Sequence, residues 1–122
     1  MHRTVNGYEE VYESIVAAQE QAQPFRYSNG LIDIPMSPIS DVTAFRSKQW
    51  KLDWFLEATR RNVEWAIKTG GVFDFLAHPS CLVIEDPKFQ TVRLICELVN
   101  AASDRAEIVT LDKIAARMGD AE

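Results

Sequence analysis

The segment Val72-Phe-Asp-Phe-Leu-Ala-His78-Pro79 constrains the fold more than any other part of the sequence. Its residues are almost continuously apolar, which is typical of a parallel strand covered on both faces. Pro79 restricts the residue before it to an extended geometry. In α/β folds, ligands and catalytic groups gather at the carboxyl ends of the strands. The sequence therefore predicts a buried strand over residues 72–77 that places His78 where chemistry takes place.

The rest of the chain alternates between helix and strand signals. Apolar residues at helical spacing predict four helices, over residues 7–22, 51–69, 87–102 and 111–118. Short apolar runs bounded by turn residues predict two further strands, over residues 31–36 and 107–110.

Strands that alternate with helices of this length indicate right-handed βαβ crossovers. We therefore expect one α/β domain over residues 1–122, built as a partial (β/α) barrel-like layer of mainly parallel strands. Three strands leave open edges, and a partner or a second copy of the chain would cover them.

Charge and composition exclude several classes of function. The net charge is −5 with a pI near 5.0, and no basic stripe is visible, which argues against nucleic acid as a partner. The two cysteines, Cys81 and Cys96, form no C-x-x-C pair, and we expect both to be reduced and packed. No segment has the length and apolarity of a signal peptide or a membrane span, so the sequence predicts a cytoplasmic protein with no membrane partner.

His78 is the candidate catalytic residue. In an extended strand alternate side chains share a face, so Asp74 and His78 project to the same side. A carboxylate there can hold the imidazole in one tautomer and prepare it as a general acid. The alternative is a histidine at the end of a strand that donates to a backbone carbonyl.

Asp33, Ser37 and Asp41 form a second polar set, at the end of the first strand and in the long loop 37–50. They either shape a substrate pocket, with the loop as a lid, or stabilise the loop through hydrogen bonds to its own backbone. Three aromatic residues follow, and they form either a platform that stacks on sugars or helix-face packing: Trp50, Trp54 and Phe55.

Three stretches together resemble the carboxyl-terminal part of polysaccharide deacetylases of the NodB-homology group, carbohydrate esterase family 4. They are Gly30-Leu-Ile-Asp-Ile-Pro-Met-Ser-Pro-Ile-Ser-Asp41, then Phe75-Leu-Ala-His-Pro-Ser80, then Ile108-Val-Thr-Leu-Asp-Lys-Ile114. The resemblance covers roughly residues 24–118. It implies a metal-dependent hydrolase on a distorted (β/α) barrel that removes acyl groups from carbohydrates or related amides.

The resemblance also implies what this chain lacks. The family binds a zinc-like divalent metal through an Asp and an H-x-x-x-H pair, and a second Asp is the general base. No H-x-x-x-H pair can be written with His2 and His78, the two histidines of the chain, and no Asp-Asp pair follows a predicted strand. The histidine of the family's last motif protonates the leaving group, and His78 occupies that place with Leu76 two residues before it. Arg26-Tyr27 is similar to the family's Arg-x-Pro-Tyr motif, but with different spacing. A full barrel of this type has roughly 200 residues or more.

Three hypotheses follow. In the first, the chain is the carboxyl-terminal portion of such a hydrolase and is inactive alone, its partner is the missing amino-terminal half of the barrel, and a metal is present only in the full-length parent. His78 is then the general acid, and the pocket residues are Asp33, Ser37, Asp41 and Asp74. In the second, the chain is a non-catalytic interaction module or a homodimer that uses its open sheet edge. In the third, it is a small independent hydrolase with a site around His78, Asp74 and Cys81.

Overall fold

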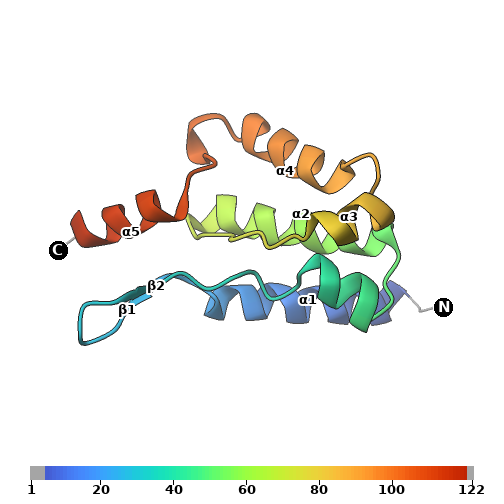
Figure 1. The fold of residues 1–122 in the computed structure, drawn as a ribbon, viewed down its shortest axis with the longest axis horizontal. Coiled ribbons are helices and arrows are strands. Elements are labelled where there is room, and N and C mark those ends of the chain that lie inside the picture. Colours follow the sequence, from blue (N-terminus) through green and yellow to red (C-terminus); the bar gives the residue numbers. More distant parts are fainter. Residues whose placement is uncertain (1–4, 121–122) are drawn as a thin grey trace.

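The computed structural model of the chain describes residues 5–120, with side chains from Glu9 to Gly119. Helices dominate it, and Figure 1 shows α2 lying between α1 and α4. The elements in chain order are α1 (Val5–Gln21), β1 (Phe25–Arg26), β2 (Ile32–Asp33), a π-helical turn η1 (Val42–Ser47), α2 (Leu52–Thr69), α3 (Pro79–Glu85), α4 (Gln90–Ala101), a 3₁₀ turn η2 (Ser103–Arg105) and α5 (Leu111–Asp120).

The predicted layer of mainly parallel strands, and with it the partial barrel, is wrong. The described structure is 62% helix, and its sheet consists of two short antiparallel strands, so the described residues form no layer of parallel strands. In this hairpin Phe25 pairs with Asp33 and Arg26 with Ile32. Of the predicted strand 31–36, the residues Ile32–Asp33 form a strand, β2. This strand follows the turn over residues 27–30.

The segments 72–77 and 107–110 are extended but belong to no sheet within residues 5–120. Side chains take the place of a neighbouring strand at one end of the first segment. The Val72 backbone N–H donates to Gln23 Oε1 at 2.7 Å, and its carbonyl accepts from Gln19 Nε2 at 2.8 Å. An apolar run predicts extended backbone, but a ladder also needs a partner strand in register, which the run does not specify.

The helical periodicity correctly predicted α1, α2 and α5 to within a few residues. The helix α2 ends at Gly70, which adopts the left-handed conformation with φ of 74°, and the Gly70 N–H bonds back to the carbonyl of Ala66. Arg26 of β1 donates through Nη2 to the carbonyl of Met118 at 3.1 Å, which ties the hairpin to α5.

The region after His78 differs from the prediction. A short helix, α3, follows the histidine with Pro79 in its first turn, and α4 begins at Gln90 instead of residue 87. Asp86 stabilises the start of α4. Its buried carboxylate accepts the backbone N–H groups of Gln90 and Thr91, each at 2.8 Å, and the Thr91 hydroxyl at 2.8 Å.

The loop 37–50 is packed into the core and is not a lid. Its residues Ile39, Ala44 and Phe45 are buried in the main apolar cluster. The Phe45 ring lies 5.0 Å from the Phe55 ring of α2, centroid to centroid. The rest of this cluster comes from α1, α2 and α3, namely Tyr12, Ala58, Cys81 and Leu82. The loop therefore has a fixed position beside α3.

None of the helices in the described residues combines the length and the apolarity that a membrane span requires.

We predict that Asp86→Ala lowers the free energy of unfolding by about 2 kcal/mol, because it leaves the first two N–H groups of α4 and the buried Thr91 hydroxyl without their acceptor. Urea denaturation followed by circular dichroism measures the change. Asp53→Ala is the matched control, since Asp53 is an exposed residue in the first turn of α2, and we expect it to change stability by no more than about 0.5 kcal/mol. Equal effects of the two variants would contradict a stabilising role for the Asp86 cap.

Candidate functional site

His78 lies at the junction between the extended segment and α3. Its backbone is extended, with φ of −117° and ψ of 118°, as the following proline requires. Its side chain is 45% exposed, while the segments on either side of it are anchored in the core. The histidine is therefore held in place and reachable from solvent.

Asp41 lies beneath His78 and is fully buried. One oxygen, Oδ2, accepts the backbone N–H of His78 at 2.6 Å. The other, Oδ1, lies 2.8 Å from the ring atom Nδ1 of His78 and also accepts the backbone N–H of Val42 at 2.8 Å. The carboxylate thus fixes both the backbone and the ring of the histidine.

This geometry determines the tautomer of His78. An ionised carboxylate can only accept hydrogen bonds, so the Nδ1 atom that faces Asp41 carries the proton. The other ring nitrogen, Nε2, forms no hydrogen bond with the described residues. It is therefore the ring atom that can exchange a proton with a bound ligand.

The other predicted pocket residues lie elsewhere. Asp33 is in the hairpin, where it accepts the hydroxyl of Tyr27 at 3.1 Å and raises the pKa of that tyrosine. Ser37 is buried, and its hydroxyl donates to the carbonyl of Ile39 at 3.3 Å. Its backbone N–H donates to the carbonyl of Asp74 at 2.8 Å, which holds the loop 37–50 against the extended segment.

Asp74 is not the partner of His78. Its side chain lines an apolar groove between the helices, and burial raises the pKa of its carboxyl group. The structure therefore brings together His78 and Asp41, and leaves Asp33 and Asp74 apart from them. From the sequence we expected Asp41 either to shape a substrate pocket or to stabilise the loop 37–50, and not to pair with His78. The contact spans 37 positions of the chain, so no local spacing signals it.

The two cysteines are free, and their environments differ. Cys96 is exposed on α4, contrary to the expectation that it is packed. Cys81 is 1% exposed in the core, and burial followed by the negative charge of Asp41 raises the pKa of its thiol. A raised pKa keeps the thiol protonated, and this opposes a role for Cys81 as a nucleophile.

The aromatic residues of the α2 region favour the packing interpretation. Phe55 is fully buried between Phe45 and Phe75, with the ring of Phe75 at 6.4 Å. Trp50 is partly buried against the same cluster. These rings stabilise the elements that carry Asp41 and His78, and Phe55 has no surface on which a sugar can stack.

No group of three or more His, Cys, Asp or Glu side chains suited to a metal ion occurs among the residues that the structure describes. The zinc-like ion of the resembled family therefore has no fitting ligand set in this part of the chain. Comparison of the sequence and structure with protein-family models, curated proteins and solved structures found no match.

We predict that Asp41→Asn lowers the free energy of unfolding by about 2 to 3 kcal/mol, because the amide nitrogen cannot accept the N–H groups that face it. In wild-type protein, ¹⁵N-detected NMR of His78 will show the proton on Nδ1, and the variant will lose this preference. Asp33→Asn is the control, since its carboxylate bonds the exposed hydroxyl of Tyr27. A His78 spectrum that is the same in wild type and Asp41→Asn would contradict the assigned pairing.

Proposed function

We propose that this chain supplies the acid–base pair of a hydrolase that cleaves a carbon–nitrogen acyl bond, such as the acetamido bond of an amino sugar. The observation that carries the proposal is the hydrogen-bonded pair of the buried Asp41 and the half-exposed His78. The resemblance of three stretches of the sequence to polysaccharide deacetylases supports the choice of substrate class, since His78 lies in the second stretch and Asp41 ends the first.

The chemistry of amide cleavage explains why such a pair is useful. Water adds to the acyl carbon, and the carbon–nitrogen bond then breaks. The leaving nitrogen is too basic to depart as an anion, so it must receive a proton as the bond breaks. His78 in its charged form donates that proton from Nε2, and the neutral imidazole then recovers a proton from solvent.

Asp41 acts through His78. Because its carboxylate is fully buried and both of its oxygens are used, it does not touch the substrate. It keeps the proton on Nδ1, so that Nε2 is the atom that gives up a proton, and its charge balances that of the imidazolium. His78 is therefore the proposed catalytic residue and Asp41 a positioning residue.

The attacking water is not assigned to a residue of this chain. The family that the sequence resembles uses a metal for that step, and the described residues offer no ligand set for one. The proposal therefore includes a second segment that lies outside these 122 residues and carries the metal ligands, either in the same polypeptide or as a separate chain. Without it we expect no turnover.

The proposal is tested by assaying acetate release from tetra-N-acetylchitotetraose in the presence of zinc. The samples are the 122-residue chain by itself and the same chain extended by the coding sequence that directly precedes the Met1 codon. We predict no release by the chain alone and chelator-sensitive release by the extended protein. In the extended protein His78→Ala lowers kcat about 10²- to 10⁴-fold, the usual contribution of a general acid.

Asp53→Asn is the matched control for this assay, because Asp53 is exposed on α2, and its kcat should equal that of wild type. Asp41→Asn should lower kcat and shift the pH profile of kcat, since it alters the group that holds the proton. Efficient turnover by the 122-residue chain alone would contradict the proposal. So would an extended protein without activity, or one in which His78→Ala is as active as wild type.

A further inference from the structure

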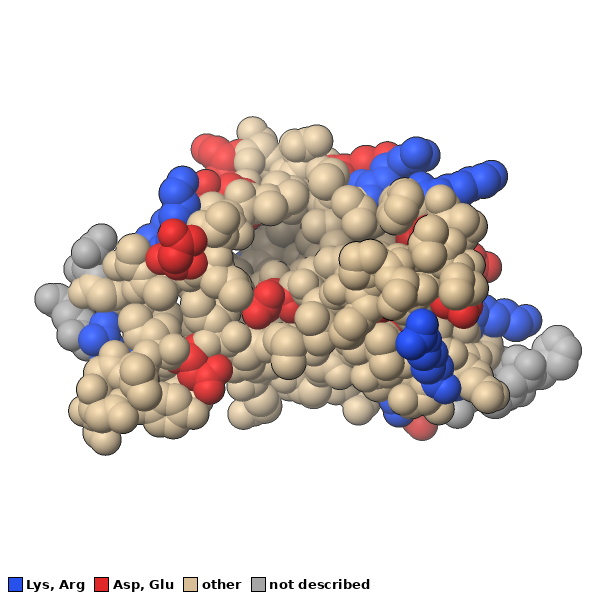
Figure 2. Space-filling view, in the orientation of Figure 1, with Lys and Arg blue, Asp and Glu red and all other residues tan. Residues whose placement is uncertain are grey.

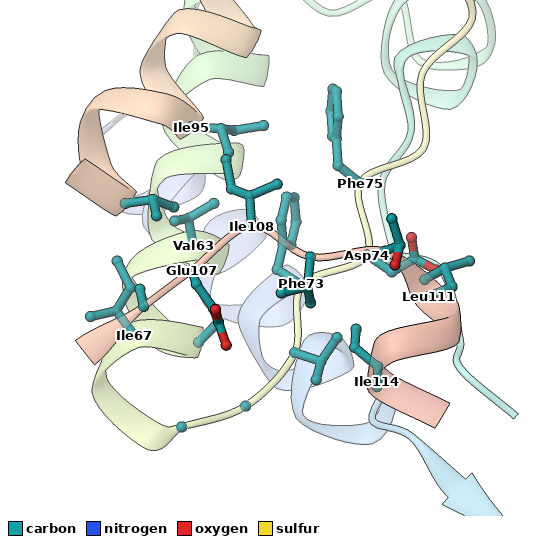
Figure 3. Close-up of a pocket in the computed structure, with 18 of the residues that line it drawn as sticks. Val63, Ile67, Phe73, Asp74, Phe75, Ile95, Glu107, Ile108, Leu111 and Ile114 are labelled. Atoms are coloured by element: carbon teal, nitrogen blue, oxygen red, sulfur yellow. The ribbon is translucent and has the colours of Figure 1, made fainter. Parts of the chain in front are cut away.

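An open apolar groove lies between the helices and the two extended segments. Its volume is about 1320 Å³, and it is bounded by α2, α4 and α5 together with residues 71–75 and 104–111. Figure 2 shows it as a deep hollow in the face of the molecule, and Figure 3 shows the side chains that line it. It is larger than most small-molecule pockets, which measure roughly 300 to 1,000 Å³.

The groove exposes side chains that folded proteins normally cover. Ile108 is 64% exposed and Leu111 is 50% exposed. Around them lie further apolar residues from several elements, including Val63, Ile67, Phe73, Ile95 and Ile114. A continuous apolar surface of this kind marks a site of association.

The walls of the groove also carry unpaired backbone. Phe73, Phe75 and Ile108 are in extended segments, and their N–H and C=O groups form no hydrogen bond with any described residue. Half-buried backbone groups without partners are unfavourable, and an added strand satisfies them. The occupant of the groove is therefore a polypeptide, since it must supply extended backbone as well as apolar side chains.

The groove is lined by charged side chains of both signs. Glu107 and Arg117 form an ion pair at 2.6 Å. Asp74 and Arg105 also line the groove, and neither forms an ion pair with the side chains that the structure describes, from Glu9 to Gly119. The carboxyl of Asp74 has its pKa raised by burial, so it lies in a poorly hydrated position. One surface thus offers an unpaired acid and an unpaired base.

We infer that this groove is the contact surface of a symmetric homodimer. In a two-fold interface the same surface meets itself, so Asp74 of one protomer faces Arg105 of the partner subunit, and the reciprocal pair forms as well. Identical extended segments that meet across a two-fold axis perpendicular to them run antiparallel, which allows their free backbone groups to pair. The inference is independent of the proposed hydrolase activity.

The mass in solution tests the inference. Sedimentation equilibrium of wild-type protein should give twice the chain mass of 13.8 kDa. Ile108→Asp should weaken self-association at least about tenfold, because it places a charge in the apolar contact of both protomers. Leu31→Asp is the matched control, since Leu31 has the same 64% exposure but lies in the hairpin; it should leave the dimer constant unchanged.

Charge reversal tests the pairing itself. Asp74→Arg and Arg105→Glu should each weaken the dimer at least about tenfold, because each places like charges opposite one another at both symmetric contacts. A mixture of the two variants should associate again, since each acid then faces a base, and so should the double variant. Circular dichroism will show whether each charge-reversed variant is folded. The variant Ile108→Asp tests the same contact surface at a more exposed position, where the substitution disturbs the fold less.

Three results would overturn the inference. The first is a wild-type protein that remains monomeric at high micromolar concentration, which would mean that a different chain covers the groove. The second is a dimer that withstands Ile108→Asp. The third is a pair of charge-reversed variants that fail to associate with each other although both are folded.

Discussion

The buried carboxylate of Asp41 is the interaction on which the arrangement of the site depends. It joins two distant parts of the chain, because it accepts the N–H of Val42 at the start of η1 and also binds both the backbone N–H and the ring of His78, which precedes α3. A buried charge is unfavourable unless such bonds compensate it. Asp41 therefore fixes the geometry of the loop 37–50 and the tautomer of the histidine at the same time.

Around this contact the core is built from segments distant in sequence. Phe45 of the loop packs on Phe55 of α2, and Phe55 in turn packs near Phe75 of the extended segment. The helix α2 packs against both α1 and α4 (Figure 1). The packed core thus carries the Asp41–His78 pair. The groove retains exposed apolar side chains and backbone groups without partners among the described residues.

The catalytic proposal and the dimer inference rest on different parts of the structure. The catalytic proposal needs a histidine that is fixed but accessible, and packing around Asp41 provides it. The dimer inference arises where packing is incomplete, because residues 72–77 and 107–110 belong to no helix and to no sheet of the described structure. A sequence whose strands lack partners within one copy can satisfy them in a second copy, at the cost of translational freedom on association.

The sequence by itself determined the local features of this protein. Periodic apolar residues predicted α1, α2 and α5, Gly70 ended α2, and Pro79 predicted the extended backbone of His78, whereas the buried strand predicted over residues 72–77 is a half-buried segment that belongs to no sheet among the described residues. These signals act over one to four residues, so propensity and spacing carry them. Tertiary structure decided that the extended runs form no parallel layer, that Asp74 faces the groove, and that Asp41 is the partner of His78. Such contacts depend on which distant segments pack together, and the spacing of residues along the chain does not contain that information.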